Sequence, residues 1–151
     1  MAGGLGMLCA GDIVVVTEDC KFALTETTLG IPPAQIAPFV SQRIGLAKAR
    51  RIMLTAARFA GKEAHEMGLA DFVAKDADDL EVIEADIKKG VLKCAPGANA
   101  VTKEIVLATR HLTRKEMIEF AAKGFAERML SDEGKEGISS FIEKRKPKWS
   151  K

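Results

Sequence analysis

The stretch from Phe22 to Pro38 reads FALTETTLGIPPAQIAP and contains a single ionisable residue, Glu26. A carboxylate with apolar neighbours and no nearby cation is costly to ionise when it is buried. Active sites use such an environment to prepare a carboxylate as a general base or acid. The alternative is a surface turn whose glutamate points into water, and the local pattern alone favours that alternative. The glycine-rich segment upstream and the order of the elements decide between the two.

The composition is that of a soluble globular protein. The 151 residues are 47% hydrophobic and 29% charged, enough for one domain with a core. A net charge of +2 creates no strong field toward nucleic acid, and a single tryptophan with no tyrosine argues against a base-stacking surface. Asp12 and Glu18 interrupt the N-terminal apolar run, which lacks the basic start of a signal peptide. We therefore expect a cytoplasmic protein that binds neither nucleic acid nor a membrane.

The cysteines and histidines offer little material for a metal site. Cys9, Cys20 and Cys94 are odd in number and share no metal-type spacing, so they are expected to be small buried hydrophobic residues in a reducing compartment. The only histidines are His65 and His111. We expect no metal ion and no histidine-based catalytic triad.

The chain opens with glycines that precede an apolar stretch. This pattern suits a tight turn leading into a helix N-terminus, whose free N–H groups can hold an anion. A dinucleotide-binding fingerprint fails here, because Cys9 stands at the third glycine position and no strand precedes the glycines. Short extended segments are predicted at 13–16, 21–23 and 69–74, and helices at 46–57 and 61–67.

From Asp78 onward nearly all of the chain is predicted to be helical. A capping box at Thr113–Glu116 opens a long helix that reaches Leu130. The tail EKRKPKWSK at 143–151 is expected to be solvated, with phosphate binding as the alternative. So few strands cannot close a sheet, so sequence is expected to be missing at the N-terminus. Apolar residues recur at helical spacing at Leu46, Ala49, Met53 and Ala57, at Leu80, Ile83, Ile87 and Leu92, and at Ile118, Phe125 and Met129, and the core candidates are Ile105 and Leu107.

Several segments together resemble the crotonase (enoyl-CoA hydratase/isomerase) superfamily. The glycine-rich turn is followed by an apolar helix, by DIVV at 12–15 and by FALTETTLGIPP at 22–33. LTAARFAGKEAHEMGLADFV at 54–73 resembles a family stretch, with Ala56 where glycine is usual. EGISSFIEKRKPKW at 136–149 resembles the family's C-terminal signature. The resemblance covers the whole chain.

The resemblance implies an α/β fold, a partial crotonase superhelix of ββα turns followed by a C-terminal helical oligomerisation region. Residues 1–75 would form the later part of the crotonase core, and residues 76–151 the helical region. Such proteins assemble as homotrimers or hexamers. The N-terminal turns, and the loop that donates the first oxyanion-hole N–H, would then precede Met1.

Within the superfamily, three stretches resemble isohexenylglutaconyl-CoA hydratases of acyclic terpene degradation most, with methylglutaconyl-CoA hydratases as near relatives. These stretches are LGIPPAQIAPFV at 29–40, LTAARF at 54–59 and KCAPGANAVTK at 93–103. The implied reaction is addition of water to the C2=C3 bond of a branched enoyl-CoA. No cofactor is expected, because the coenzyme A thioester is itself the substrate.

The family's catalytic groups map onto two positions. A backbone N–H that stabilises the thioester enolate matches Gly3, and one glutamate of the hydratase pair matches Glu26. The other glutamate would fall at Gly6, which has no side chain. The loop P-G-x-G-G-T is also altered, since only Pro33 matches and bulkier residues follow it. We expect those residues to reshape the acyl pocket for a branched substrate.

Two C-terminal residues match positions that approach the nucleotide of coenzyme A in relatives, Phe141 and Lys144. A core phenylalanine at a helix end with a solvated lysine is the alternative for this pair. For the whole chain two alternatives stay open: an enoyl-CoA double-bond isomerase, for which one carboxylate suffices, and a truncated, non-catalytic assembly partner.

Overall fold

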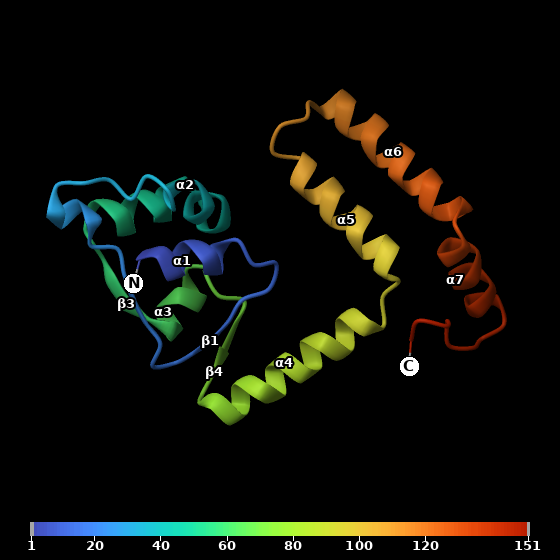
Figure 1. Cartoon of the computed structure of the whole chain (residues 1–151), viewed down its shortest axis with the longest axis horizontal. Helices are drawn as coiled ribbons and strands as arrows, with labels where there is room; N and C mark the ends of the chain where they lie inside the picture. The colour runs from blue at the N-terminus through green and yellow to red at the C-terminus, as the bar shows by residue number, and fades with distance from the viewer. Residues whose placement is uncertain (1, 151) are drawn as a thin grey trace. The chain divides into compact units, whose positions relative to one another are not determined.

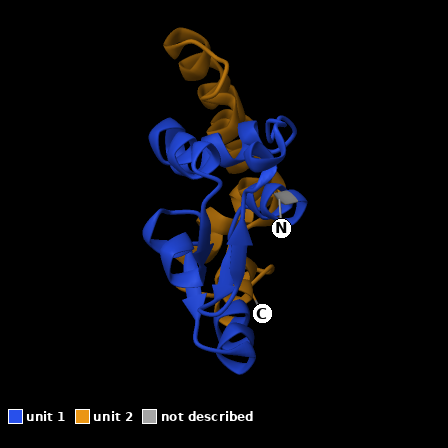
Figure 2. Cartoon of the chain, turned by 90° about the vertical axis from the view of Figure 1, so that its left-hand side faces the viewer, with its two compact units in different colours: residues 1–85 blue, residues 86–151 orange. Residues whose placement is uncertain are grey.

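The computed structural model describes residues 2–150, and Figure 1 shows the order of its elements. The chain forms two compact units, Met1–Ala85 and Asp86–Lys151, which Figure 2 colours separately. Each unit is described by itself below. The expected division between residues 75 and 76, which concerns the family core and its helical extension, stays a prediction.

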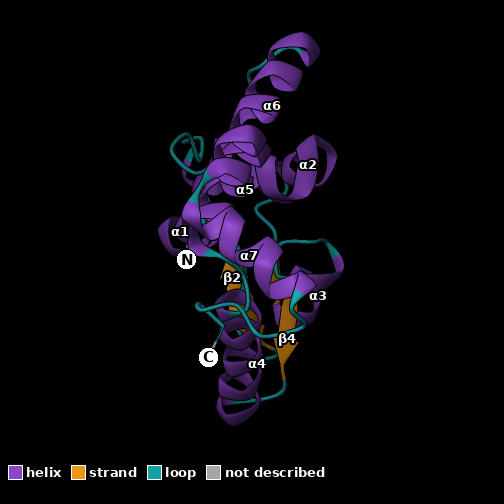
Figure 3. Ribbon diagram, turned by 90° about the vertical axis from the view of Figure 1, so that its right-hand side faces the viewer, coloured by secondary structure: helices purple, strands orange, loops and turns teal. Residues whose placement is uncertain are grey.

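Unit 1 combines helices with two very small sheets (Figure 3). Strand β1 pairs in parallel with β4, and β2 pairs antiparallel with β3. The mixed α/β class is therefore confirmed, with few strands and mostly helix. The elements are α1 (Ala2–Cys9), β1 (Val15–Thr17), β2 (Lys21–Ala23), the 3-10 helix η1 (Glu26–Leu29), α2 (Ala37–Leu54), β3 (Arg58–Ala60), α3 (Gly61–Glu66) and β4 (Phe72–Ala74).

The strand that the sequence did not predict is β3. Its three residues follow directly on a helical pattern, so no run of alternating side chains was long enough to indicate a strand. Its pairing with β2 brings Phe59 opposite Phe22, and the two rings stack with their centroids 5.3 Å apart. This contact anchors the small sheet in the core of unit 1.

The core of unit 1 lies between its helices and sheets. The largest fully buried side chains are those of Leu5, Leu24, Ile52, Leu69 and Val40. Of the apolar positions in the predicted helix at 46–57, Ala49 and Met53 are buried, whereas Leu46 is 71% exposed. Gly45 interrupts α2 with a φ of 78° and a ψ of 160°, so Leu46 is the first residue of its second helical segment.

One arginine connects three segments of unit 1. Arg43 donates from Nε to the carbonyl of Leu69 at 2.6 Å and from Nη1 to the carbonyl of Gly11 at 2.9 Å. Its Nη2 lies 2.5 Å from Asp71 Oδ2, the same oxygen that accepts the N–H of Val14 at 2.7 Å. This network fixes α2 against the segments that flank β1 and β4.

Unit 2 is helical, as the sequence predicts. Helix α4 (Ala77–Leu92) runs across the boundary between the two units, and its end leads into unit 2. The other helices of this unit are α5 (Pro96–Ala108), α6 (Arg114–Leu130) and α7 (Asp132–Ile142), and α6 packs against both α5 and α7. The capping box at Thr113 is confirmed, because the N–H of Thr113 donates to Glu116 Oε2 at 2.7 Å. The hydrogen bonds from Thr113 lower the pKa of the Glu116 carboxyl.

The apolar stripes of unit 2 are mostly not buried within the chain. Leu92 is 67%, Ile118 63% and Phe125 67% exposed, and Met129 is also exposed, so these predicted stripes are not covered within the unit. Leu107 is exposed as well, so its prediction as a core residue is wrong. Among the described residues of this unit, only Ala108 and Ser140 are buried. The helices pack pairwise, so much of each apolar side faces no other element of the unit.

Two smaller predictions also need correction. Cys9 is buried, Cys20 is half-buried and Cys94 is exposed, so only the first is a buried hydrophobic residue; burial raises the pKa of its thiol. The basic tail is not simply solvated. Arg145 donates two hydrogen bonds to the carboxylate of Glu136, at 2.6 and 3.0 Å, and the Trp149 indole N–H donates to the carbonyl of Lys93 at 3.2 Å. Within residues 2–150, no helix is long and apolar enough to cross a membrane.

Candidate active site

Glu26 is the first residue of η1, which directly follows β2 and buried Leu24. The turn is held to the end of α2, because Thr27 Oγ1 donates to the carbonyl of Met53 at 3.1 Å. Gly30 ends the turn with a φ of 76°, a left-handed conformation that glycine adopts without steric cost. The backbone that carries Glu26 is therefore fixed on both sides.

The carboxylate of Glu26 is half-buried and does not point freely into water. Its Oε2 atom is buried and has no hydrogen-bond partner among the described residues. Buried polar atoms are nearly always paired, so an unpaired carboxylate oxygen is a position where a ligand or a water molecule can donate a hydrogen bond. This geometry favours the active-site interpretation of Glu26 over a solvated surface turn.

Gly3 lies in the first turn of α1. The first four N–H groups of a helix have no acceptor within the helix, and the helix dipole gives this end a positive potential. Gly3 is exposed, and a Cβ atom built on it would meet no atom within 4 Å. The glycines thus lie inside the helix rather than in a turn before it, and Gly3 leaves open space beside its backbone.

The structure brings Gly3 and Glu26 together. Both line one hollow of about 360 Å³, whose remaining wall is the segment Ile31–Ile36. Gly3 belongs to helix α1 and Glu26 to η1, and the rest of the lining includes Pro32 and Pro33. The chemical roles of the two residues stay predictions, but their juxtaposition is what a site for proton transfer beside an oxyanion requires.

Ile36 occupies the space beside Gly6, where the sequence lacks the second glutamate. A Cβ atom at Gly6 would lie 2.5 Å from Cγ2 and 3.0 Å from Cβ of Ile36, closer than real Cβ atoms approach such neighbours. Gly6 is buried, and Ile36 also lines the hollow that contains Glu26. The sequence indicated that a side chain was missing here, but it could not indicate that another residue fills the place.

Glu26 also lines a second, larger hollow of about 730 Å³. Its walls come from β2, β3 and η1, and its lining is mainly apolar. The lining includes two cations, Lys21 and Arg58. Sequence reasoning missed Arg58 because it missed β3; the pairing of two short strands is the signal that places this cation near Glu26.

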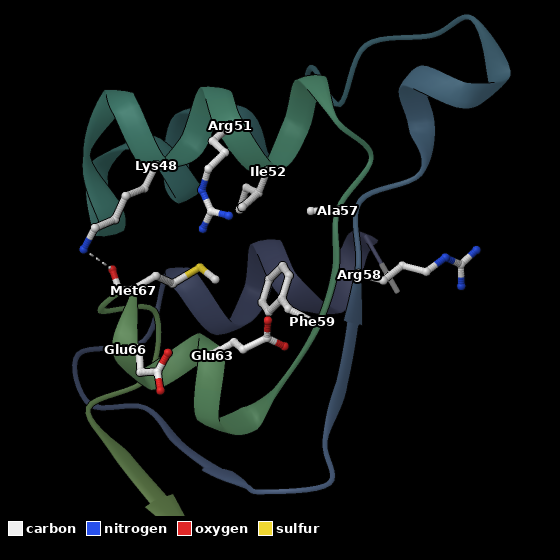
Figure 4. Close-up of a pocket in the computed structure, with 9 residues that line it drawn as sticks. All are labelled: Lys48, Arg51, Ile52, Ala57, Arg58, Phe59, Glu63, Glu66 and Met67. Carbon is white, nitrogen blue, oxygen red and sulfur yellow. Dashed lines mark hydrogen bonds between the residues drawn. The ribbon is translucent and has the colours of Figure 1, made fainter.

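A third hollow of about 430 Å³ lies between α2, β3 and α3 (Figure 4). Lys48 donates from Nζ to the carbonyl of Met67 at 2.8 Å, and Glu63 and Glu66 project from α3. Arg58 is also at its edge, but Figure 4 shows this side chain pointing away from the other labelled residues. Neither Gly3 nor Glu26 contributes to this hollow, so we do not assign it to the candidate site.

Phe141 and Lys144 lie at the end of α7, in unit 2. Phe141 is 85% exposed and is not a core residue of this unit. Lys144 is exposed and has a positive φ of 53°, and its N–H donates to the carbonyl of Phe141 at 3.2 Å. Their contact with coenzyme A stays a prediction, and they belong to a different unit from Gly3 and Glu26.

Comparison with known proteins identifies relatives along the whole chain. The family model for enoyl-CoA hydratase/isomerase matches residues 1–151. The solved structure of Pseudomonas aeruginosa AtuE is 47% identical with a TM-score of 0.97, and the match covers 99% of this chain and 58% of that one. An enoyl-CoA hydratase/isomerase from Marinobacter aquaeolei is 39% identical with a TM-score of 0.96, covering 100% and 57%.

A curated relative carries a different activity in its name. The peroxisomal Delta(3,5)-Delta(2,4)-dienoyl-CoA isomerase of Arabidopsis thaliana is 30% identical over 155 residues, which cover 100% of this chain and 55% of that protein. In this isomerase and two further curated relatives, the chain spans at most 58% of the other protein's length.

Proposed function

The chain belongs to the enoyl-CoA hydratase/isomerase (crotonase) family, and on that premise we propose that it adds water to the C2=C3 bond of a branched enoyl-CoA. The observation that carries this proposal is the hollow shared by Gly3 and Glu26, with the unpartnered Oε2 atom of Glu26 beside it. An acyl-CoA thioester is the substrate, and no further cofactor takes part.

The Glu26 carboxylate and the Gly3 N–H have different roles in the proposed reaction. Glu26 takes a proton from water while the hydroxide oxygen forms a bond to C3 and the C2=C3 electron pair moves to C2. The negative charge spreads onto the thioester oxygen, which accepts a hydrogen bond from the Gly3 N–H at the positive end of α1. Glu26 then returns the proton to C2, which completes the addition of water without another acid.

A branched acyl group of the isohexenylglutaconyl type is the substrate that we propose. The support is the segment Ile31–Ile36, which lines the hollow and lacks the glycines that the family's loop carries. Ile36 narrows the space beside Gly6, so the position that a second carboxylate would need is filled by a methyl-bearing side chain. We further propose that the exposed apolar faces of unit 2 support a homotrimer or hexamer.

The test is Glu26→Gln in the full protein, measured as kcat for hydration of a branched enoyl-CoA. A general base contributes about two to four orders of magnitude to the rate, so we expect a loss in that range. Glu81→Gln on the exposed face of α4 is the matched control and should leave kcat unchanged. Full activity of the Glu26 variant would refute the assignment.

A second candidate function is double-bond isomerisation, for which a single carboxylate is sufficient. It is favoured by the lack of a side chain at Gly6 and by the dienoyl-CoA isomerase among the relatives. Reaction in H₂¹⁸O separates the two, because hydration incorporates one oxygen and bond migration incorporates none. If the full protein carries out neither reaction and does not bind the thioester, the non-catalytic assembly partner is the remaining interpretation.

A further inference from the structure

The face of the β2–β3 sheet that points away from the core carries two cations and two alanines. Successive side chains of a strand point to opposite faces. Since Phe22 and Phe59 point together into the core, Lys21 and Ala23 of β2 lie on the other face, with Arg58 and Ala60 of β3.

The register places the two cations diagonally across that face. Ala23 is opposite Arg58 and Lys21 is opposite Ala60, so each cation faces an alanine rather than the other cation. Diagonal neighbours in such a ladder lie about 7–8 Å apart. The two alanines leave open the space between the charges, which is the large hollow that Glu26 also lines.

Neither cation is neutralised within the part of the chain that the structure describes. The side chains of Lys21 and Arg58 form no hydrogen bond or ion pair with another described residue, and both are exposed. The only acid that lines the hollow is Glu26. Two positive charges against one negative charge leave a net attraction for an anion beside a mainly apolar wall.

We propose that this hollow binds a carboxylate carried by the acyl group of the substrate, with Arg58 and Lys21 as its partners. A glutaconyl-type acyl group, as in the proposed function, carries such a free carboxyl group, and the inference is that these two residues hold it. This inference rests on the proposed function, because it places the reacting double bond at Glu26. The planar guanidinium of Arg58 matches the two oxygens of a carboxylate, and the two alanines accommodate the carbon chain that bears it.

The phosphates of coenzyme A are the other anionic groups on such a substrate. The shared hollow favours the acyl carboxylate, because Glu26 lies at one side of it and the cations lie on the adjoining sheet face. An anion held there is next to the reacting carbons, whereas the coenzyme A phosphates are separated from them by the pantetheine arm.

The experiment compares two substrates that differ only in that carboxyl group. kcat/KM of the full protein is measured with 3-methylglutaconyl-CoA, which carries it, and with 3-methylcrotonyl-CoA, which does not. A hydrogen bond to a charged group contributes about 1.5–3 kcal/mol, so Arg58→Gln should lower kcat/KM for the carboxylated substrate roughly 10- to 100-fold. In the same variant, kcat/KM for the neutral substrate should change less than about twofold.

Matched variants make the result specific. Lys21→Gln should give a smaller loss with the same selectivity, and Arg58→Lys should restore part of the activity because it keeps the charge. Arg50→Gln, an exposed cation on α2 outside the hollow, should affect neither substrate. Equal losses on both substrates would assign the cations to the coenzyme A phosphates and overturn the proposal, as would no loss on either.

Binding measurements test this inference independently of the proposed reaction. Calorimetric affinities are measured for the two hydrated products, 3-hydroxy-3-methylglutaryl-CoA and 3-hydroxyisovaleryl-CoA. A preference for the carboxylated product that Arg58→Gln abolishes supports the site, even if hydration itself is not observed. Equal affinities in the wild-type protein would overturn it, even if hydration is observed.

Discussion

Both units of this chain carry large apolar side chains, but they use them differently. Unit 1 buries its large apolar side chains against one another, with Leu5, Leu24 and Ile52 almost inaccessible. Unit 2 leaves Phe125, Leu130 and many other apolar side chains exposed on its helices. A helical apolar stripe therefore predicts that a face will be covered, but it does not predict that the same chain covers it.

The largest expected difference between the units is in the response to truncation of an apolar side chain. Ile52→Ala should lower the free energy of unfolding of unit 1 by about 2–5 kcal/mol, because it leaves a cavity in a closed core. Phe125→Ala in unit 2 should change it by less than about 0.5 kcal/mol at high dilution, since that ring is 67% exposed. Urea denaturation followed by circular dichroism measures both.

Protein concentration sharpens this test. If unit 2 is covered by another copy of the chain, the loss at Phe125 should grow with concentration, whereas the loss at Ile52 should not depend on it. Equal losses for the two variants at high dilution would contradict the difference in burial on which the comparison rests.

The parts of the fold that were predictable are those with a local physical cause. The capping box at Thr113 needs only residues three apart, and the strand at 21–23 needs only a short extended run. Strand β3 and the exposure of Leu46 were not predictable in this way. The first depends on pairing with β2, which is distant in sequence, and the second on which segments cover the start of the helical segment after Gly45.

The candidate site shows the same division. Glu26 and Gly3 could be proposed from a resemblance, because the residue types that carry the chemistry stand in recognisable segments. The residues that surround them in space could not be proposed in this way. The methyl groups of Ile36 beside Gly6 and the position of Arg58 near Glu26 both depend on contacts between segments, which no local pattern specifies.

Two glycine-to-alanine substitutions should have opposite effects on stability, one in the closely packed unit 1 and one in an exposed helix. In Gly6→Ala the new Cβ would lie 2.5 Å from Ile36 Cγ2, so we expect a loss of about 1–3 kcal/mol from overpacking. Gly90→Ala in α4 meets no atom within 4 Å and should stabilise the helix by roughly 0.5–1 kcal/mol. Urea unfolding curves give both values.

The second substitution Ile36→Ala identifies the cause of the Gly6 effect. If the clash with Ile36 is responsible, the double variant Gly6→Ala, Ile36→Ala should be more stable than the sum of the two single losses predicts. Strict additivity would mean that the new methyl group meets something else, and the account of how Ile36 fills the site would fail.

The smallest predicted effect is local and concerns the tail that follows α7. The hydrogen bonds from Arg145 lower the pKa of the Glu136 carboxyl to about 2, and Glu136 raises the pKa of Arg145 in turn. Because the folded pKa of Glu136 lies below its ordinary value of 4.5, the stabilisation is complete above about pH 4.5 and is lost as the pH falls toward 2. The tail should therefore separate from α7 in that interval.

Trp149 reports this release, since it is the only tryptophan and lies against Gly137, with its ring carbon Cη2 3.2 Å from the Cβ position there. Its fluorescence should change between about pH 4.5 and 2 in the wild-type protein. In Glu136→Gln the ion pair is lost, so the released spectrum should already be present at pH 7, while Glu143→Gln removes only one exposed partner of Arg145 and should leave the neutral-pH spectrum unchanged. A transition that persists in Glu136→Gln would assign it to another carboxyl. A different acidic contact would then hold the tail on unit 2, and the ion pair of Arg145 with Glu136 would not be what keeps it in place.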